Sequence, residues 1–165
     1  MKAILDASPI IAFFAEMREP DILFLLRRLE YELLVPFAVS HRDITREPSK
    51  TILARAAANG AVSLLPPVAP EKLAAFMHSH PSLGEGESEV ILLALDFRSQ
   101  RAAAVCIIDE RAARRIARDL DLPVKGTLGV LRTLQGSGLI GHEDLTRLRG
   151  RLRAAGFRAD ASLLR

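Results

Sequence analysis

Acidic side chains stand where two apolar, strand-like runs of this chain end and where one helix begins. Because the carboxyl ends of parallel strands meet at one edge of a sheet, right-handed connections can bring these acids together. Several carboxylates at one place repel one another, and such a cluster persists when a cation fills it. Ligand sets of oxygen alone favour the hard ions Mg²⁺ and Mn²⁺. The acids are Asp6 after the run 2–5, Glu85, Glu87 and Glu89 at the start of the helix, and Asp109 and Glu110 after the run 104–108.

Arginines lie close to the last of these acids. Arg111, Arg114, Arg115 and Arg118 are spaced to share one face of a helix that follows Asp109. A guanidinium group suits bidentate contact with phosphate, and a divalent ion can activate water and neutralise charge on a phosphate. Together the acids and the arginines predict metal-dependent cleavage of a phosphodiester.

Each of these residues also has a purely structural interpretation. An aspartate after a strand is often the N-cap of the next helix, and glutamates in a first helical turn often serve only the helix dipole. The arginine face can simply be solvated. Thr127, which follows a further strand, is expected either to hydrogen-bond a carboxylate of the site or to cap its own helix.

Strand and helix signals alternate along the chain, and the strongest strands are uninterrupted apolar runs. This pattern is typical of a parallel sheet covered by helices on both faces. We therefore expect an α/β fold, a three-layer sandwich with a central parallel sheet, in a single domain over residues 1–165 with a basic helical segment at about 142–165. The expected strands are 2–5, 32–35, 61–65, 104–108 and 123–125; the expected helices start at Ser8 (as N-cap), Pro20 and Pro36, span 48–59, 70–80, 85–98, 109–119 and 144–155, and follow Gly126-Thr127 up to Leu134.

The composition limits the classes of protein that this chain can be. With 165 residues, 49% hydrophobic and 26% charged, it is long and apolar enough to form its own core, which excludes disorder as the main state. Its one cysteine excludes a disulfide scaffold, and no charge-free run is long enough for a membrane span. Asp6 interrupts the apolar start, so we expect no signal peptide and a cytoplasmic setting. The net charge is only +3, but the arginines cluster, which fits a nucleic-acid partner.

Four runs of the sequence resemble a known family. Residues 5–12 read LDASPIIA, residues 84–91 read GEGESEVI, and residues 107–111 and 123–131 read IIDER and PVKGTLGVL. The first two runs resemble the opening and middle motifs of the PIN-domain nucleases. The last two resemble a bacterial and archaeal PIN-like subfamily that is similar to the VapC-type toxins of toxin–antitoxin pairs. The likeness extends from Ile4 to about Ile140, and its most specific part is the Gly-Thr-Leu-Gly run.

The resemblance implies a compact parallel α/β sandwich, a Mg²⁺ or Mn²⁺ site and cleavage of single-stranded RNA. By motif position, Asp6, Glu89 and Asp109 match the catalytic, metal-binding acids of the family. The additional acids that could join them are Asp43, Glu85, Glu87 and Glu110, and the residues expected at the phosphate or the RNA are Arg111, Arg114, Arg115, Ser8 and Thr127.

The resemblance also implies protein partners. A VapC-type chain would be a toxin restrained by a small antitoxin, and the family makes a homodimer plausible. Apolar residues on the early helices could supply the dimer surface, although burial in the core explains them equally well; they are Phe13, Phe14, Phe24 and Leu25.

One position departs from the family pattern. The family carries a glutamate in the helix after its second strand, and the run VPFAVSHRD at residues 35–43 places Arg42 there. Asp43 lies one residue later, about 100° around an α-helix. Either Asp43 or Glu47 substitutes through a local shift, or metal binding is weakened. The alternative function is therefore a catalytically weakened or inactive PIN-like module that binds RNA or protein.

Overall fold

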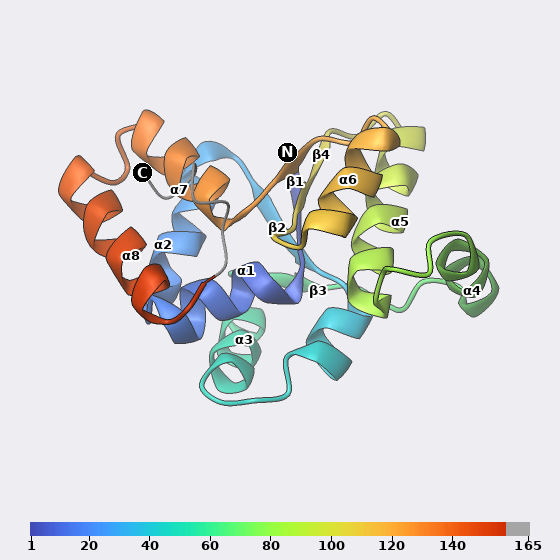
Figure 1. Ribbon diagram of the computed structural model, residues 1–165, viewed down its shortest axis with the longest axis horizontal. Coiled ribbons are helices and arrows are strands. Elements are labelled where there is room, and N and C mark those ends of the chain that lie inside the picture. The colour runs from blue at the N-terminus through green and yellow to red at the C-terminus, as the bar shows by residue number, and fades with distance from the viewer. Residues whose placement is uncertain (158–165) are drawn as a thin grey trace.

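The central sheet has five strands, all parallel, in the order β3-β2-β1-β4-β5. The structure is a computed structural model and describes residues 1–157. Helices cover both faces of the sheet, so the expected three-layer α/β sandwich is confirmed (Figure 1). The strands are β1 (Lys2–Leu5), β2 (Glu32–Val35), β3 (Ser63–Leu64), β4 (Ala104–Ile107) and β5 (Val124–Lys125).

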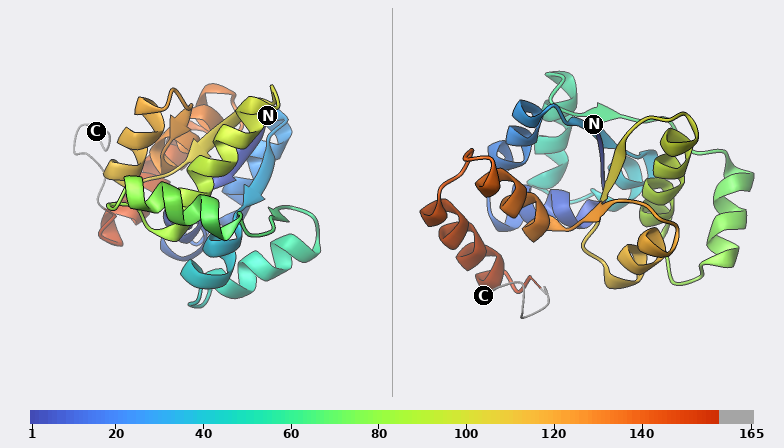
Figure 2. Two further views of the ribbon diagram at one scale, coloured as in Figure 1. Left: turned by 90° about the vertical axis from the view of Figure 1, so that its right-hand side faces the viewer. Right: turned by 90° about the horizontal axis from the view of Figure 1, so that it is seen from above.

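The helices fall into two groups, one on each face of the sheet. The views of Figures 1 and 2 agree that α4, α5 and α6 lie on one face, and that α1, α2, α7 and α8 lie on the other. The α-helices are α1 (Ala7–Ile11), α2 (Pro20–Phe24), α3 (Ser49–Ala58), α4 (Pro70–Ser79), α5 (Glu85–Ser99), α6 (Arg111–Asp119), α7 (Thr127–Gly136) and α8 (His142–Ala154). Three further helical segments depart from α-helical geometry. They are the wider π-helices η1 (Ala12–Glu16) and η3 (Val39–Asp43) and the tighter 3₁₀-helix η2 (Leu25–Leu29).

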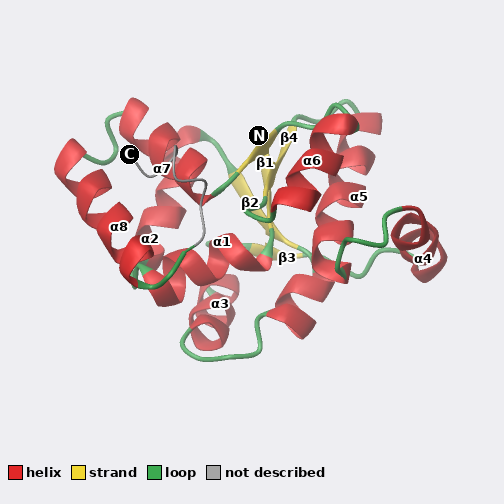
Figure 3. Ribbon diagram, viewed as in Figure 1, coloured by secondary structure: helices red, strands yellow, loops and turns green. Residues whose placement is uncertain are grey.

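Strand β1 is the middle of the sheet and its most buried part. Ala3 and Ile4 are completely buried, because β2 pairs on one side, β4 on the other, and helices pack on both faces. The sequence meets this requirement with an unbroken apolar run rather than an alternating one. In the pairing of β1 with β4, Leu5 lies opposite Ile107, so both strands end at the same level. The residues that follow them therefore meet at one edge of the sheet (Figure 3).

The first helix begins two positions earlier than the sequence predicts. It starts at Ala7, so Asp6 rather than Ser8 occupies the N-cap position. Apart from the first helix, the expected elements occur in the expected order, and Gly60 ends α3 with a positive φ of 73° as predicted for a C-terminal cap.

Helix α4 is less buried than its apolar residues predict. Leu73, Phe76 and Met77 are only half-buried, and no residue of the helix is fully buried. The reason is its place in the fold, because α4 lies against α5 at the outside of the molecule and does not touch the sheet layer (Figure 1).

The phenylalanines of the early helices belong to the core. Phe13 and Phe14 are at most 1% exposed, and Phe24 meets Phe14 edge to face with ring centroids 5.8 Å apart. Phe24 and Leu25 are half-buried. Core burial, rather than a dimer surface, is therefore the correct interpretation of Phe13 and Phe14.

A cluster of ion pairs fixes α8 to the first helical layer. Arg147 and Arg151 both pair with Glu19, and Arg151 Nη1 also donates to the carbonyl oxygen of Met17 at 2.7 Å. This clasp places the end of α8 beside η1. The part of the expected basic segment at 158–165 lies outside the described residues. Among residues 1–157 we find no helix with the length and apolar character that a membrane crossing requires.

Candidate active site

Asp6 lies at the end of the central strand and is almost completely withdrawn from water. Asp6 is only 3% exposed, and its backbone N–H donates to the carbonyl oxygen of Ile107 at 3.0 Å. Burial raises the pKa of Asp6 to about 7, because a charged carboxylate is poorly solvated there. The negative charges of Glu87 and Asp43 raise this pKa further, while the backbone N–H groups of Ala7 and Ser8 lower it. Asp6 is therefore an acid whose charge the fold does not neutralise by itself.

Asp43 approaches Asp6 because of an irregular helical turn. The N–H of Ile44 donates to the carbonyl oxygen of Val39 at 2.9 Å, five residues back, which makes η3 a π turn with one residue more than an α turn. The extra residue of the π turn offsets the one-residue displacement of Asp43 from the family position at 42. The Asp43 carboxylate lies so close to Gly86 that a Cβ atom there would be 2.2 Å from Oδ2. Burial and the negative charge of Glu89 raise the pKa of Asp43.

Arg42, the residue at the departed family position, lies close enough to the acids for its positive charge to lower the pKa of Asp43. Its side chain is 58% exposed and forms an ion pair with Glu85 at the start of α5. Glu47 is also outside the site, since its carboxylate accepts hydrogen bonds from the N–H and the hydroxyl of Thr51, at 3.1 and 2.9 Å. Of the two acids that the sequence offers as substitutes, the structure brings Asp43 to Asp6.

Glu87 and Glu89 are two residues apart on α5 and point in different directions, as the helical period requires. Glu87 is half-buried and faces the acids, and burial raises its pKa, as do the charges of Glu110 and Asp43. Glu89 is 2% exposed, and its two carboxylate oxygens accept hydrogen bonds from the N–H groups of Ala38, at 2.7 Å, and Val68, at 3.2 Å. Glu89 thus joins the helical turn after β2 to the loop before α4, and its charge also raises the pKa of Asp43, so its expected place among the metal ligands stays a prediction.

Asp109 follows β4 and is held by the start of α7. The N–H of Thr127 donates to Oδ1 at 2.7 Å, and the Thr127 hydroxyl donates to Oδ2 at 2.5 Å. Gly126 makes this approach possible, because a Cβ atom there would lie 2.7 Å from Oδ1. Burial raises the pKa of Asp109, while Thr127 and the charge of Arg114 lower it. The alternative in which Thr127 hydrogen-bonds a site carboxylate is the one found.

Glu110 has a structural place beside Asp109. It is the N-cap of α6, and its side chain accepts a hydrogen bond from the N–H of Ala113 at 3.0 Å. Its charge nevertheless reaches Glu87, whose pKa it raises.

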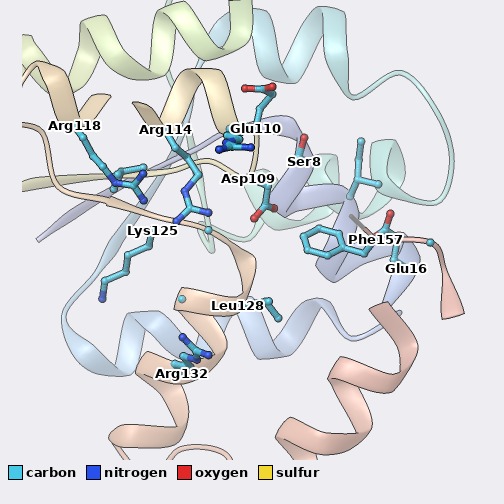
Figure 4. Close-up of a pocket in the computed structure, with 16 residues that line it drawn as sticks. Ser8, Glu16, Asp109, Glu110, Arg114, Arg118, Lys125, Leu128, Arg132 and Phe157 are labelled. Carbon is cyan, nitrogen blue, oxygen red and sulfur yellow. The ribbon is translucent and has the colours of Figure 1, made fainter. Parts of the chain in front are cut away.

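A wide basic groove opens next to Asp109 (Figure 4). Its volume is about 1130 Å³, and Asp109 and Ser8 lie on its wall. Arg115 lies outside the groove, 82% exposed and 3.8 Å from Asp119, which differs from the expectation that it contacts phosphate. The basic side chains that line the groove are Arg111, Arg114, Arg118, Lys125 and Arg132.

Four charged or aromatic residues of the groove were not predicted from the sequence as part of a site. Glu16 ends η1, Lys125 lies on β5, Arg132 is on α7, and Phe157 follows α8. Lys125 is held in place, since its ammonium group donates to the Thr133 hydroxyl at 2.8 Å. The sequence did contain a signal for two of them. Lys125 and Arg132 flank the Gly-Thr-Leu-Gly run, whose Thr127 hydrogen-bonds Asp109.

A family model described as a PIN domain matches residues 2–165 of the chain. The chain belongs to the PIN-domain family. The expected family is thereby confirmed, while the likeness to VapC-type toxins stays a prediction. A search of curated proteins and a search of solved structures found no match to the chain. PIN domains are generally nucleases and usually use divalent metals, so the family indicates nuclease-type chemistry at this edge of the sheet.

The acids of this PIN domain fit a hard divalent cation in their chemistry. Asp6, Asp43 and Glu87 offer only carboxylate oxygens, and the pKa of each is raised by burial and by neighbouring negative charge. A cation between them would remove that repulsion. Within residues 1–157, however, no three acidic, histidine or cysteine side chains converge closely enough to hold a metal ion. A bound ion would therefore draw the carboxylates together.

We predict that replacing Glu89 and Glu87 with glutamine has different effects on stability. In Glu89→Gln one of the two backbone N–H donors must face the amide NH₂ group, which lowers the free energy of unfolding by about 2 kcal/mol. Glu87→Gln keeps an acceptor for the Gly84 N–H and removes a repelling charge, so the protein is as stable as the parent or more so. Thermal unfolding of both variants checks this, and equal destabilisation would contradict the assignment of Glu89 to a structural place.

We predict that Asp6→Asn gains stability relative to the parent as the pH rises in metal-free buffer. In the unfolded chain Asp6 loses its proton near 3.8, and in the folded chain near 7. Between these values the folded state binds more protons, so rising pH lowers the free energy of unfolding of the parent, by roughly 4 kcal/mol at most. Asparagine has no such loss, so its advantage grows up to about pH 7 and is then constant. Urea unfolding at several pH values measures this, with Asp96→Asn on the exposed side of α5 as the control; a difference that does not change with pH would refute it.

Proposed function

We propose that this PIN domain is a divalent-metal-dependent endoribonuclease that cleaves single-stranded RNA. The observation that carries the proposal is a buried acid, Asp6, beside Asp43 and Glu87, at the sheet edge where the basic groove opens. Ser8 and Asp109 line that groove and so connect it to the acids. A groove with five basic side chains fits a polyanion whose phosphates can follow it.

The residues of the chain would divide the work of cleavage. Arg114 is placed to hold the phosphate, because its Nε is shielded from water without a hydrogen-bond partner and its charge lies near Asp109. Thr127 keeps the Asp109 carboxylate oriented. Asp6, Asp43 and Glu87 would hold Mg²⁺ or Mn²⁺, and cation binding would release the proton that Asp6 retains near neutral pH. The bound ion would polarise the attacking water and neutralise charge on the phosphate.

The alternative is a PIN domain that binds RNA without cleaving it. The separation of the acids within residues 1–157 and the arginine at position 42 favour this alternative. Binding of single-stranded RNA together with no cleavage in Mn²⁺ would establish it. The toxin role, the small antitoxin, the homodimer and the cytoplasmic setting rest on the resemblance and stay predictions.

We predict that Asp6→Asn lowers Mn²⁺-stimulated cleavage of a single-stranded RNA by at least about 100-fold, since a pre-positioned charge is lost at the reacting centre. Asp96→Asn is the matched control, because Asp96 pairs with Lys72 on the far side of α5. We expect this variant to retain full activity. Gel analysis of a labelled oligonucleotide measures the rates. Unchanged cleavage by Asp6→Asn would place the activity elsewhere or in a contaminant.

We predict that Asp43→Asn lowers cleavage at least about tenfold, whereas Arg42→Gln changes it little. The reason is that the π turn directs Asp43 toward Gly86, while Arg42 pairs with Glu85 near the surface. The same assay and Mn²⁺ titration calorimetry test both variants. The reverse order of effects would mean that Arg42 holds the family position in space as well as in sequence.

A further inference from the structure

Phe157 brings an aromatic ring into the basic groove. It follows α8, and its N–H donates to the carbonyl oxygen of Leu152 at 2.9 Å after a turn at Gly156 with a φ of 79°. The clasp of Arg147 and Arg151 on Glu19 fixes the helix that carries it. Among the described residues that line the groove, Phe157 is the one aromatic side chain. It is half-buried, with contact to the core and with access to the groove.

The ring of Phe157 packs against the core and also faces the groove, where a base could stack on it. Figure 4 shows Phe157 beside Asp109 and Ser8, where a nucleic-acid strand held by Arg114 would pass. Single-stranded nucleic acids are commonly bound by basic grooves that also offer an aromatic face, because each base has a π surface that stacks on it. An aromatic ring next to the reacting phosphate therefore orients the nucleotide at that phosphate.

Glu16 is an unexpected residue in a groove for a polyanion. It lines the same groove, and Figure 4 shows it next to Phe157. Its Oε2 is shielded from water and has no hydrogen-bond partner. Burial and the charge of Asp109 raise the pKa of Glu16, so this carboxyl group lacks stabilising donors in the free protein. Because Glu16 lines the groove, a turn of its carboxylate toward a ligand would give this unsatisfied oxygen an N–H donor.

We infer that Phe157 and Glu16 form a nucleobase subsite beside Asp109, in which Phe157 stacks on the base and Glu16 accepts a hydrogen bond from its exocyclic amino group. This inference rests on the proposed function, since it assumes that single-stranded RNA occupies the groove. The subsite favours cytosine over uracil, because uracil carries a carbonyl oxygen where cytosine has the amino group, and two acceptors repel. It also favours guanine over hypoxanthine, because hypoxanthine lacks the 2-amino group and leaves Glu16 without a donor.

The stacking part is tested by binding in EDTA, which excludes metal-dependent cleavage from the readout. Fluorescence anisotropy with a cytosine-containing oligonucleotide gives a Kd about tenfold weaker for Phe157→Leu than for the parent. Leucine keeps an apolar contact with the core, and circular dichroism verifies the fold. With an abasic oligonucleotide of equal length the two proteins bind equally, because only the phosphates remain. Equal loss on both oligonucleotides would show that Phe157 acts on the fold and would overturn the inference.

A direct signal of stacking is available because the chain contains no tryptophan. Phe157→Trp introduces a single fluorophore, whose emission is quenched when the cytosine-containing oligonucleotide binds and not when the abasic one binds. Phe76→Trp on α4, away from the groove lining, is the matched control and shows no quenching. Binding by Phe157→Trp without quenching would overturn the stacking.

The base preference is tested with Glu16→Gln. The parent binds an oligonucleotide with one cytosine among uracils more tightly than the uracil-only chain, and a guanine-containing one more tightly than its inosine counterpart. Glu16→Gln loses both preferences while its affinity for the uracil-only chain rises, since a negative charge has left the groove. Equal preferences in parent and variant would overturn the role of Glu16. No binding of any RNA at low salt would instead refute the proposed function itself.

Discussion

The site depends on a carboxyl group that the fold buries among other acids. Asp6 follows the central strand, so every element that packs around β1 also removes water from Asp6. The resulting pKa of about 7 measures how poorly the protein alone stabilises this charge. An apolar residue at this position would pack without the cost of burying a charge next to Asp43 and Glu87. The unfavourable burial makes sense when a cation or a phosphate-bound ion completes the site.

Some of the surrounding acids accept backbone hydrogen bonds that stabilise the fold around the site, and others direct their carboxylates toward Asp6. Glu89 joins Ala38 and Val68 through backbone hydrogen bonds, and Glu110 caps α6. Both stabilise the loops that carry the facing acids. Asp109 does both, since Thr127 fixes its two oxygens while it lines the groove. These contacts hold the acids in place, and a bound ion would draw the carboxylates together.

Much of the fold was predictable because the sheet is buried on both faces. Unbroken apolar runs predicted β1 and β4, and Gly60 predicted the end of α3. The sequence could not decide whether Asp43 takes the place of the family glutamate, because a π turn has no simple sequence signal. Only the hydrogen bond from the Ile44 N–H to the Val39 carbonyl oxygen reveals the turn. The place of Glu89 depends on backbone groups distant in the sequence, at Ala38 and Val68, so spacing alone could not separate it from Glu87.

The groove shows where prediction from one sequence stops. Arg111 and Arg114 follow Asp109 directly, so their proximity to the acids was expected from local spacing. Glu16 and Phe157 come from opposite ends of the chain and line the same groove because α8 buries its leucines in the core and is clasped to Glu19. The same clasp therefore links a stabilising contact to the shape of the binding surface. In the proposed function the acidic edge supplies the chemistry, the arginines supply affinity for phosphate, and Phe157, which follows α8, is placed with Glu16 to distinguish one nucleotide from another.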